Sequence, residues 1–223
     1  MNAAERALEY IHDGSVVGLG TGRAATAFIR ALGGRVQDGL KVRGVPTSRT
    51  SAELARQLGI PLTSLEEVEA IDVDVDGADE VDPHLNLIKG RGGALVREKV
   101  VAAASRLFVV VVTGRDKLVD QLGSHGDLPI EVIPFALSFC RRRLAEFGCK
   151  PRPRTNPDGS LFVTDNQNHI LDCMIDPIPD PEGLELAIRS IPGVVGTGLF
   201  LGMAHAVLIE DGGAVEVRER HPL

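Results

Sequence analysis

The stretch "SVVGLGTGRAATAFIRALGG" (residues 15–34) contains the pattern that decides the fold. Its first six residues are mostly apolar and lead into a glycine turn, which predicts a buried strand. Residues 23–34 predict a helix that ends at a glycine. A strand that passes through a glycine turn into a helix is the repeating unit of parallel sheets.

The alternation of strand and helix continues on both sides of this stretch. Residues 1–14 predict an amphipathic helix that stops at Gly14. Further strands are expected at 41–45, 71–76 and 107–112, and helices at 50–59 and 93–104. Strands that alternate with helices imply a parallel sheet covered on both faces. We therefore expect an α/β fold with a Rossmann-like parallel-sheet domain.

The pattern changes near residue 129, where the order becomes strand, helix, strand, strand, helix, strand. This βαββαβ order is typical of a ferredoxin-like α+β domain. Its elements are expected at 130–133, 134–148, 161–164, 170–175, 181–193 and 194–201, with a proline-rich loop at 150–160. We predict that residues 129–200 form this smaller domain. Residues 1–128 and 201–223 would form the Rossmann-like domain, with strands in 204–217 returning to its sheet.

The composition narrows the range of partners. A formal net charge of −7 argues against nucleic acid and against an anionic membrane surface. No apolar run approaches the ~18 residues of a spanning helix, and the amino end does not resemble a signal peptide. Three cysteines without a C-x-x-C pair predict reduced thiols in a cytoplasmic protein, and the six histidines lack zinc-site spacing. We expect no metal.

The acidic stretch "DVDVDGADEVD" (72–82) raises the possibility of a calcium loop. An EF-hand needs a bidentate glutamate at loop position 12, where this chain has Pro83. Residues 71–75 also alternate with period two, as a strand does. The stretch is better interpreted as a strand that ends in a polar turn, whose carboxylates face a ligand rich in hydroxyl groups.

The turn "GLGTG" (18–22) resembles a dinucleotide-binding turn only in part. Its spacing is G-x-G-x-G, and "VPTSRT" (45–50) stands where an acidic residue would bind a ribose. The backbone N–H groups of a glycine turn and a helix N-terminus form an anion site, which Arg23 could reinforce. A tight turn with a surface arginine remains the alternative.

The stretch "KGRGGALVREK" (89–99) combines a glycine loop with charged side chains. Its three glycines let the backbone approach a ligand closely, and Lys89 stands at the start of the loop. Glu98 has apolar neighbours at helical spacing, so desolvation should raise the pKa of its carboxyl towards that of a useful base. Lys99 has equally apolar neighbours, so an exposed, ion-paired Glu98 stays an alternative. Lys117 follows a strand and either binds the same ligand or is merely solvated.

Taken together, these motifs resemble those of the ribose-5-phosphate isomerase A family over nearly the whole chain. The resemblance rests on "GLGTG" (18–22), "VDGADEVD" (75–82), "LIKGRGGALVREK" (87–99), "KLVDQLG" (117–123), "PIEVIP" (129–134), "VTDNQNHILD" (163–172) and "PGVVGTGLF" (192–200). It implies interconversion of D-ribose 5-phosphate and D-ribulose 5-phosphate through an enediolate, in the non-oxidative pentose phosphate pathway. It further implies a homodimer whose partner is a small sugar phosphate, and the reaction needs no cofactor.

The resemblance also implies roles for individual residues. Glu98 would accept the proton. The implied reaction also needs positive charge where the oxyanion develops, for which Lys89 is the first candidate and Lys117 the second. The two aspartates of the D-G-A-D turn would hold hydroxyls and assist ring opening. The residues expected to bind substrate are Thr21, Gly22, Arg23, Ala24, Asp76, Gly77, Ala78, Asp79, Lys89, Gly90, Arg91, Gly92 and Lys117. Because carboxylates repel phosphate, we expect the phosphate to lie towards Arg23 and Lys117.

Three positions depart from the family pattern. Arg23-Ala24 replaces a common Ser-Thr, Arg91 replaces a glycine, and residues 114–116 replace an Asp-x-Ser before Lys117. These changes affect the expected phosphate contacts and the width of the glycine loop. The alternatives are a non-catalytic sugar-phosphate sensor and a related sugar-phosphate isomerase or deaminase.

Overall fold

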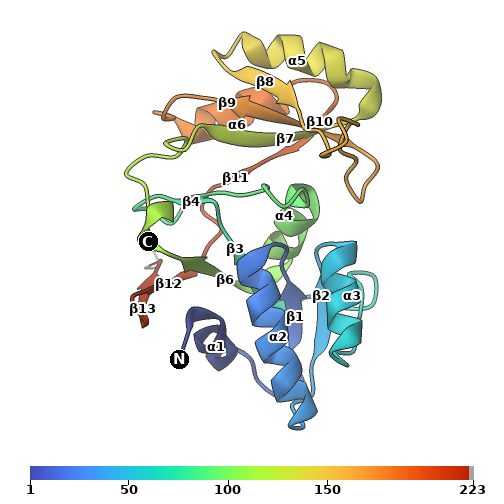
Figure 1. Cartoon of the computed structure of the whole chain (residues 1–223), viewed down its shortest axis with the longest axis vertical. Helices are drawn as coiled ribbons and strands as arrows, with labels where there is room; N and C mark the ends of the chain where they lie inside the picture. The colour runs from blue at the N-terminus through green and yellow to red at the C-terminus, as the bar shows by residue number, and fades with distance from the viewer. Residues whose placement is uncertain (221–223) are drawn as a thin grey trace. The chain divides into compact units, whose positions relative to one another are not determined.

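The structure, a computed structural model, describes residues 1–220 and divides the chain into two compact units (Figure 1). The first unit contains Met1–Ala78, Arg97–Lys117 and the segment from Gly202 onward. The second contains Asp79–Val96 and Leu118–Leu201, and so takes in all of the predicted smaller domain. Because a compact unit need not fold independently, the predicted domain boundaries stay a prediction.

The first unit is built on a six-stranded sheet. In spatial order its strands are β13 (Ala214–Glu219), β12 (Ala206–Asp211), β6 (Ser105–Thr113), β3 (Ile71–Gly77), β1 (Val16–Leu19) and β2 (Arg43–Pro46). All neighbouring pairs are parallel except β12 and β13, which form an antiparallel hairpin. Residues 108–112 of β6 are at most 1% exposed, as expected of a strand covered on both faces. The predicted parallel sheet and its returning strands are confirmed.

The α-helices along this part of the chain begin near their predicted starts, and two short 3-10 helices had no separate prediction. They are α1 (Ala3–Ala7), the 3-10 helix η1 (Leu8–Tyr10), α2 (Arg23–Gln37), α3 (Arg49–Gln57), α4 (Leu95–Ala103) and the 3-10 helix η2 (Arg115–Lys117). The amino-terminal helix is shorter than predicted, because the chain is already extended at Ile11. Conversely, α2 continues past its predicted end at Gly34. A Cβ at Gly33 would lie 2.8 Å from the Leu58 side chain, so this glycine allows close packing rather than ending the helix.

The second unit contains a four-stranded antiparallel sheet in the order β10-β7-β9-β8. Its elements along the chain are β7 (Asp127–Val132), the 3-10 helix η3 (Pro134–Ala136), α5 (Leu137–Ala145), β8 (Lys150–Pro153), β9 (His169–Met174), α6 (Pro181–Arg189) and β10 (Val194–Thr197). The strand order and the βαββαβ sequence of elements agree with the predicted ferredoxin-like arrangement.

The second strand of this sheet lies in a different place from the predicted one. We expected residues 161–164 to pair with 170–175 and residues 150–160 to form a loop, but β8 at 150–153 pairs with β9 instead. β8 is an edge strand. An edge strand can contain proline, which has no backbone N–H, at positions whose N–H would not pair with the neighbouring strand. A strand containing prolines at alternate positions therefore resembled a loop in the sequence.

The predicted strand 194–201 is also divided. Its last residues form β11 (Leu199–Phe200), which joins β5 (Leu87–Ile88) and β4 (Glu80–Val81) in a separate three-stranded sheet. The break falls at Gly198, where a Cβ would lie 2.3 Å from the backbone oxygen of Lys89. The chain changes sheets where only glycine fits.

Each unit has its own hydrophobic core. The core of the first unit includes Phe28, Ile29 and Leu32 of α2, all fully buried. All three cysteines are buried free thiols in the core of the second unit. Within residues 1–220, no helix combines the length and the hydrophobicity needed to cross a bilayer.

Candidate active site

The turn at residues 18–22, the first glycine turn, fits closely around the carboxylate of Asp76. Asp76 is fully buried at the end of β3, and its Oδ1 accepts hydrogen bonds from Thr21 N (3.0 Å) and Gly77 N (2.7 Å). A Cβ at Gly20 would lie 2.3 Å from Asp76 Cγ. The absence of a side chain at Gly20 therefore lets the buried carboxylate approach the turn.

A cluster of hydroxyl groups supports the other side of the first glycine turn. Thr21 Oγ1 lies 2.7 Å from Thr47 Oγ1 and 2.9 Å from Ser48 Oγ. Ser51 Oγ donates to Gly20 O (2.5 Å), and Thr47 Oγ1 donates to Leu19 O (3.0 Å). In the sequence, the Thr-Ser segment after β2 stands out only because it lacks the acidic residue of a dinucleotide site. The segment follows the carboxyl end of a parallel strand, where ligands usually bind in such sheets, and this position could have marked it as part of the site.

The N-terminus of α2 directly follows this turn. Gly22 is the N-cap residue with φ +104°, and Arg23 is the exposed first residue of the helix. Orphan N–H groups and the helix dipole favour an anion at such an end. The predicted anion site therefore has the required local geometry, and its ligand stays a prediction.

Glu98 and Lys99 were not distinguished by the sequence, but they differ in burial. Glu98 on α4 is 2% exposed, whereas the neighbouring Lys99 is only half-buried. The alternative of a solvent-exposed Glu98 is therefore wrong. A carboxylate at this position is removed from most solvent, which suits a general base.

Lys117 contacts the D-G-A-D turn directly. Its Nζ donates to Ala78 O (2.5 Å), so the side chain that ends η2 lies beside the segment that follows β3. Arg115 instead pairs with Asp211 (3.1 Å) and Glu216 (2.5 Å) of the β12–β13 hairpin. The departure at residues 114–116 thus leaves Lys117 next to the predicted substrate residues.

Lys89 begins the second glycine turn, residues 89–93, and is a buried cation. It is 2% exposed, its backbone N donates to Gly198 O (2.9 Å), and its Nζ lies 5.5 Å from the centre of the Phe200 ring. A cation over an aromatic face gains a favourable interaction that helps offset its lost hydration. The second glycine turn therefore presents a fixed positive charge.

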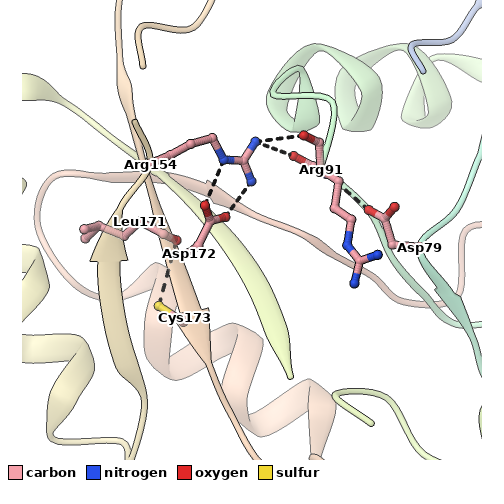
Figure 2. A network of polar contacts seen from close by, with 7 residues as sticks. Asp79, Arg91, Arg154, Leu171, Asp172 and Cys173 are labelled. Atoms are coloured by element: carbon pink, nitrogen blue, oxygen red, sulfur yellow. Dashed lines mark hydrogen bonds and ion pairs between the residues drawn. The ribbon is translucent and has the colours of Figure 1, made fainter. Parts of the chain in front are cut away.

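Asp79 connects the acidic turn to the second glycine turn. Its backbone N donates to Ile88 O (2.8 Å), and its Oδ2 accepts a hydrogen bond from Arg91 N (3.1 Å) (Figure 2). Arg154, which lies in the segment predicted to be a proline-rich loop, donates to the backbone oxygens of Gly90 and Arg91. Nothing in the local sequence pattern indicated this contact, because it joins residues more than 60 positions apart.

Two further carboxylates of the acidic stretch have structural roles. Glu80 is 1% exposed and accepts hydrogen bonds from the backbone N of Gly123 and of His125, both at 2.6 Å. Asp82 accepts from the backbone N of His84 and of Asn86, both at 2.8 Å. Glu80 and Asp82 therefore hold loops, whereas the carboxylates of Asp76 and Asp79 adjoin the glycine turns.

The predicted site residues fall into two local groups, one in each compact unit. Thr21, Gly22, Arg23, Ala24, Asp76, Gly77, Ala78, Glu98 and Lys117 belong to the first unit, and Asp79, Lys89, Gly90, Arg91 and Gly92 to the second. Ala78 and Asp79 are consecutive, so the acidic turn itself contributes to both groups. Among residues 1–220, no group of three or more His, Cys, Asp and Glu side chains is placed to hold a metal ion.

Comparison with known proteins identifies the family. The family model described as ribose 5-phosphate isomerase A (phosphoriboisomerase A) matches residues 43–213, well over half of the chain. The chain belongs to the ribose 5-phosphate isomerase A family. Among curated members, that of Roseiflexus castenholzii is 52% identical over 218 residues, covering 96% of this chain and 93% of its own.

Solved structures of ribose 5-phosphate isomerases share the fold over nearly the full length. The isomerase A of Methanocaldococcus jannaschii is 40% identical with a TM-score of 0.92, covering 98% of this chain and 96% of its own. A D-ribose-5-phosphate isomerase in complex with phospho-erythronic acid is 42% identical with a TM-score of 0.94, at the same coverage. Nothing in these matches favours the sensor or deaminase alternatives.

Proposed function

We propose that this member of the family interconverts D-ribose 5-phosphate and D-ribulose 5-phosphate through an enediolate, with Glu98 as the base. Isomerase activity follows from family membership, and it places the reaction in the pentose phosphate pathway. The observation that carries the role of Glu98 is its burial, at 2% exposure, on the helix that follows the second glycine turn. A relative of 42% identity binds phospho-erythronic acid, whose planar carboxylate resembles an enediolate in shape and charge.

In the proposed reaction, the Glu98 carboxylate removes the hydrogen on C2 of the open-chain aldose. The C2–H bond breaks, a C1–C2 double bond forms, and negative charge develops on the former carbonyl oxygen. Glu98 then returns the proton to C1 while a proton moves from the C2 hydroxyl to the oxygen on C1. Electrons and protons balance within the substrate, so the reaction needs no redox cofactor.

Lys89 is the proposed partner of the developing oxyanion. Its ammonium is largely removed from solvent, where a fixed charge interacts more strongly with developing negative charge than it would in water. Asp76 and Asp79 are proposed to accept hydrogen bonds from sugar hydroxyls and to assist ring opening. The backbone contacts of both carboxylates support this role, because they fix the carboxylates before substrate binds.

The proposed test of Glu98 is its replacement by Gln, which keeps the shape and removes the base. Ketose formation from ribose 5-phosphate should fall about 10²–10⁴-fold, the usual contribution of a general base. Exchange of the C2 hydrogen with D₂O should fall equally. Glu66→Gln, at an exposed position, is the matched control. Activity of Glu98→Gln within tenfold of wild type would show that the base lies elsewhere.

We further propose that the phosphate binds towards the first glycine turn, near Arg23 and Lys117, and the sugar towards the aspartates. The N-terminus of α2 and the two cationic side chains support this polarity. Arg23→Ala should weaken inhibition by inorganic phosphate, whereas Asp79→Asn should not. The reverse pattern would show that the substrate lies in the opposite orientation.

A homodimer in the cytoplasm is also proposed. Phe135 of η3 is 98% exposed and adjoins the partly exposed Ile133 and Phe139, an apolar group suited to a second copy of the chain. Three buried free thiols are typical of a reducing compartment. Sedimentation velocity should give a dimer mass at micromolar concentration, and a monomer at that concentration would contradict the proposal.

A further inference from the structure

Arg154 links the sheet of the second unit to the second glycine turn. Its Nε and Nη2 bind the two carboxylate oxygens of Asp172, at 2.9 Å and 2.5 Å (Figure 2). Its Nη1 donates to Gly90 O (3.0 Å) and Arg91 O (3.1 Å). A planar guanidinium can make both sets of contacts at once, whereas a lysine ammonium cannot reproduce the paired geometry.

These contacts fix one peptide group at both ends. The carbonyl oxygen and the N–H of a trans peptide point in opposite directions, and the described chain contains no cis peptide. In the peptide between Gly90 and Arg91, the oxygen is held by Arg154 and the N–H is held by Asp79 Oδ2. The orientation of this peptide and the position of the Asp79 carboxylate are therefore set together.

The position of Arg154 is itself determined by its surroundings. Asp172 lies on β9, which is paired on both sides by β7 and β8, and the side chain of Arg154 is only 14% exposed. The guanidinium carbon lies 5.8 Å from the centre of the Phe162 ring. The same ring packs so closely on Gly93 that a Cβ there would lie 2.5 Å from Phe162 Cζ. Arg154 thus holds Gly90 and Arg91, and Phe162 packs on Gly93 at the end of the second glycine turn.

We propose that Arg154, oriented by Asp172, is a positioning residue of the isomerase: it sets the Gly90–Arg91 peptide and, through that peptide, the carboxylate of Asp79. This inference rests on the proposed role of Asp79 in binding sugar hydroxyls. The sheet of the second unit then does more than complete the fold, because its β8–β9 edge fixes a carboxylate that acts on substrate.

The kinetic test compares Arg154→Gln with Arg152→Gln, which changes an exposed arginine two positions earlier in the chain. Arg154→Gln should lower kcat/KM about 10- to 100-fold, the effect of displacing a group that orients substrate, while Arg152→Gln should not. Arg154→Lys should stay at least fivefold impaired despite its retained charge. Equal activity of the two glutamine variants, or wild-type activity of Arg154→Lys, would overturn the proposal.

A double-mutant cycle separates positioning from a general structural role. In an Asp79→Ala background, Arg154→Gln should change kcat/KM by less than about threefold, because the carboxylate that it positions is absent. If the two losses multiply instead, Arg154 does not act through Asp79. Should Arg154→Gln fail to fold, Asp172→Asn takes its place in the same cycle, with the same two outcomes.

Hydrogen exchange of the substrate-free protein tests, independently of activity, whether Arg154 holds the Gly90–Arg91 peptide. Amides of residues 90–92 should exchange faster in Arg154→Gln than in wild type, while those of β6 should be unchanged. If the exchange pattern is as expected but the wild-type protein is inactive, the proposed function is overturned, whereas the role of Arg154 in holding the Gly90–Arg91 peptide is supported. If the wild-type enzyme is active but exchange at residues 90–92 is the same in Arg154→Gln, the proposed positioning role of Arg154 is overturned.

Discussion

The two glycine turns, each proposed to bind substrate, are held in place by different means. The first glycine turn continues a central strand, since Gly18 pairs with Asp74 in the β1–β3 ladder and Gly20 N donates to Val75 O. The second glycine turn lies outside the two larger sheets. Beyond the backbone bond from Lys89 N to Gly198 O, it depends on Arg154 and Phe162, side chains from distant parts of the chain. A turn can thus be positioned by the backbone ladder of its own sheet or by side chains brought from elsewhere.

The largest effect is expected from Gly20→Ala in the first glycine turn. The new Cβ would overlap the buried Asp76 side chain, so the sheet and the carboxylate must both shift. The free energy of unfolding should fall by about 2–3 kcal/mol, as in an overpacked core. Displacement of Asp76 should lower kcat/KM by about 100-fold.

Urea denaturation and steady-state kinetics measure both changes. The control is Gly34→Ala in α2, where a Cβ would meet nothing within 4 Å. Alanine there should raise the free energy of unfolding by about 0.5–1 kcal/mol and leave activity unchanged. If both variants behaved alike, close packing would not explain the glycine of the first turn.

A smaller effect is expected from Gly93→Ala in the second glycine turn. Gly93 has φ +81°, which costs an alanine about 1–2 kcal/mol, and its Cβ would overlap the Phe162 ring. Adding Phe162→Leu should restore the part of the unfolding free energy lost to steric overlap, but not the part lost to the positive φ. A denaturation cycle in which Phe162→Leu recovers nothing would show that the ring is not the obstacle.

The smallest effect is expected from Thr47→Val beside the first glycine turn. The substitution keeps the volume and removes the hydrogen bonds of Thr47 Oγ1 with Leu19 O and with Thr21 Oγ1. Leu19 O still accepts from Thr47 N at 3.0 Å, and Thr21 Oγ1 still bonds Ser48 Oγ. The free energy of unfolding should fall by about 1 kcal/mol. Thr63→Val, at a surface hydrogen bond to Glu67, is the control and should change it by less. A loss as large as that of Gly20→Ala would mean that the hydroxyl cluster, rather than the ladder, holds this turn.

The same contrast explains what the sequence could predict. Local patterns contain the information for the first glycine turn, because an apolar strand, its glycines and the next helix are consecutive in the chain. The burial of Glu98 does not follow from a short-range pattern, because Lys99 has equally apolar neighbours at helical spacing, whereas the polar turn after β3 does. The parallel sheet and the ferredoxin-like order of the second unit were predicted for the same reason.

What the sequence did not reveal depends on pairing between distant residues. Edge strand β8 contains prolines at two of its four positions, and only its partner β9 makes it recognisable as a strand. Arg154 follows that strand, so its contacts with Asp172 and Gly90 were hidden by the same error. To predict the hydroxyl cluster of Thr47, Ser48 and Ser51, one would have to know which loops meet at the sheet edge.

The division of the chain has a consequence for its synthesis on the ribosome. The unit that contains the amino terminus is finished last, since β12 is needed between β6 and β13 while the second unit ends at Leu201. Roughly 100 residues separate the ends of β6 and β12, which takes roughly 5–20 s to translate. During that interval the valine-rich edge of β6 has no neighbour on one side, so the nascent chain exposes an aggregation-prone edge that a bound chaperone would shield.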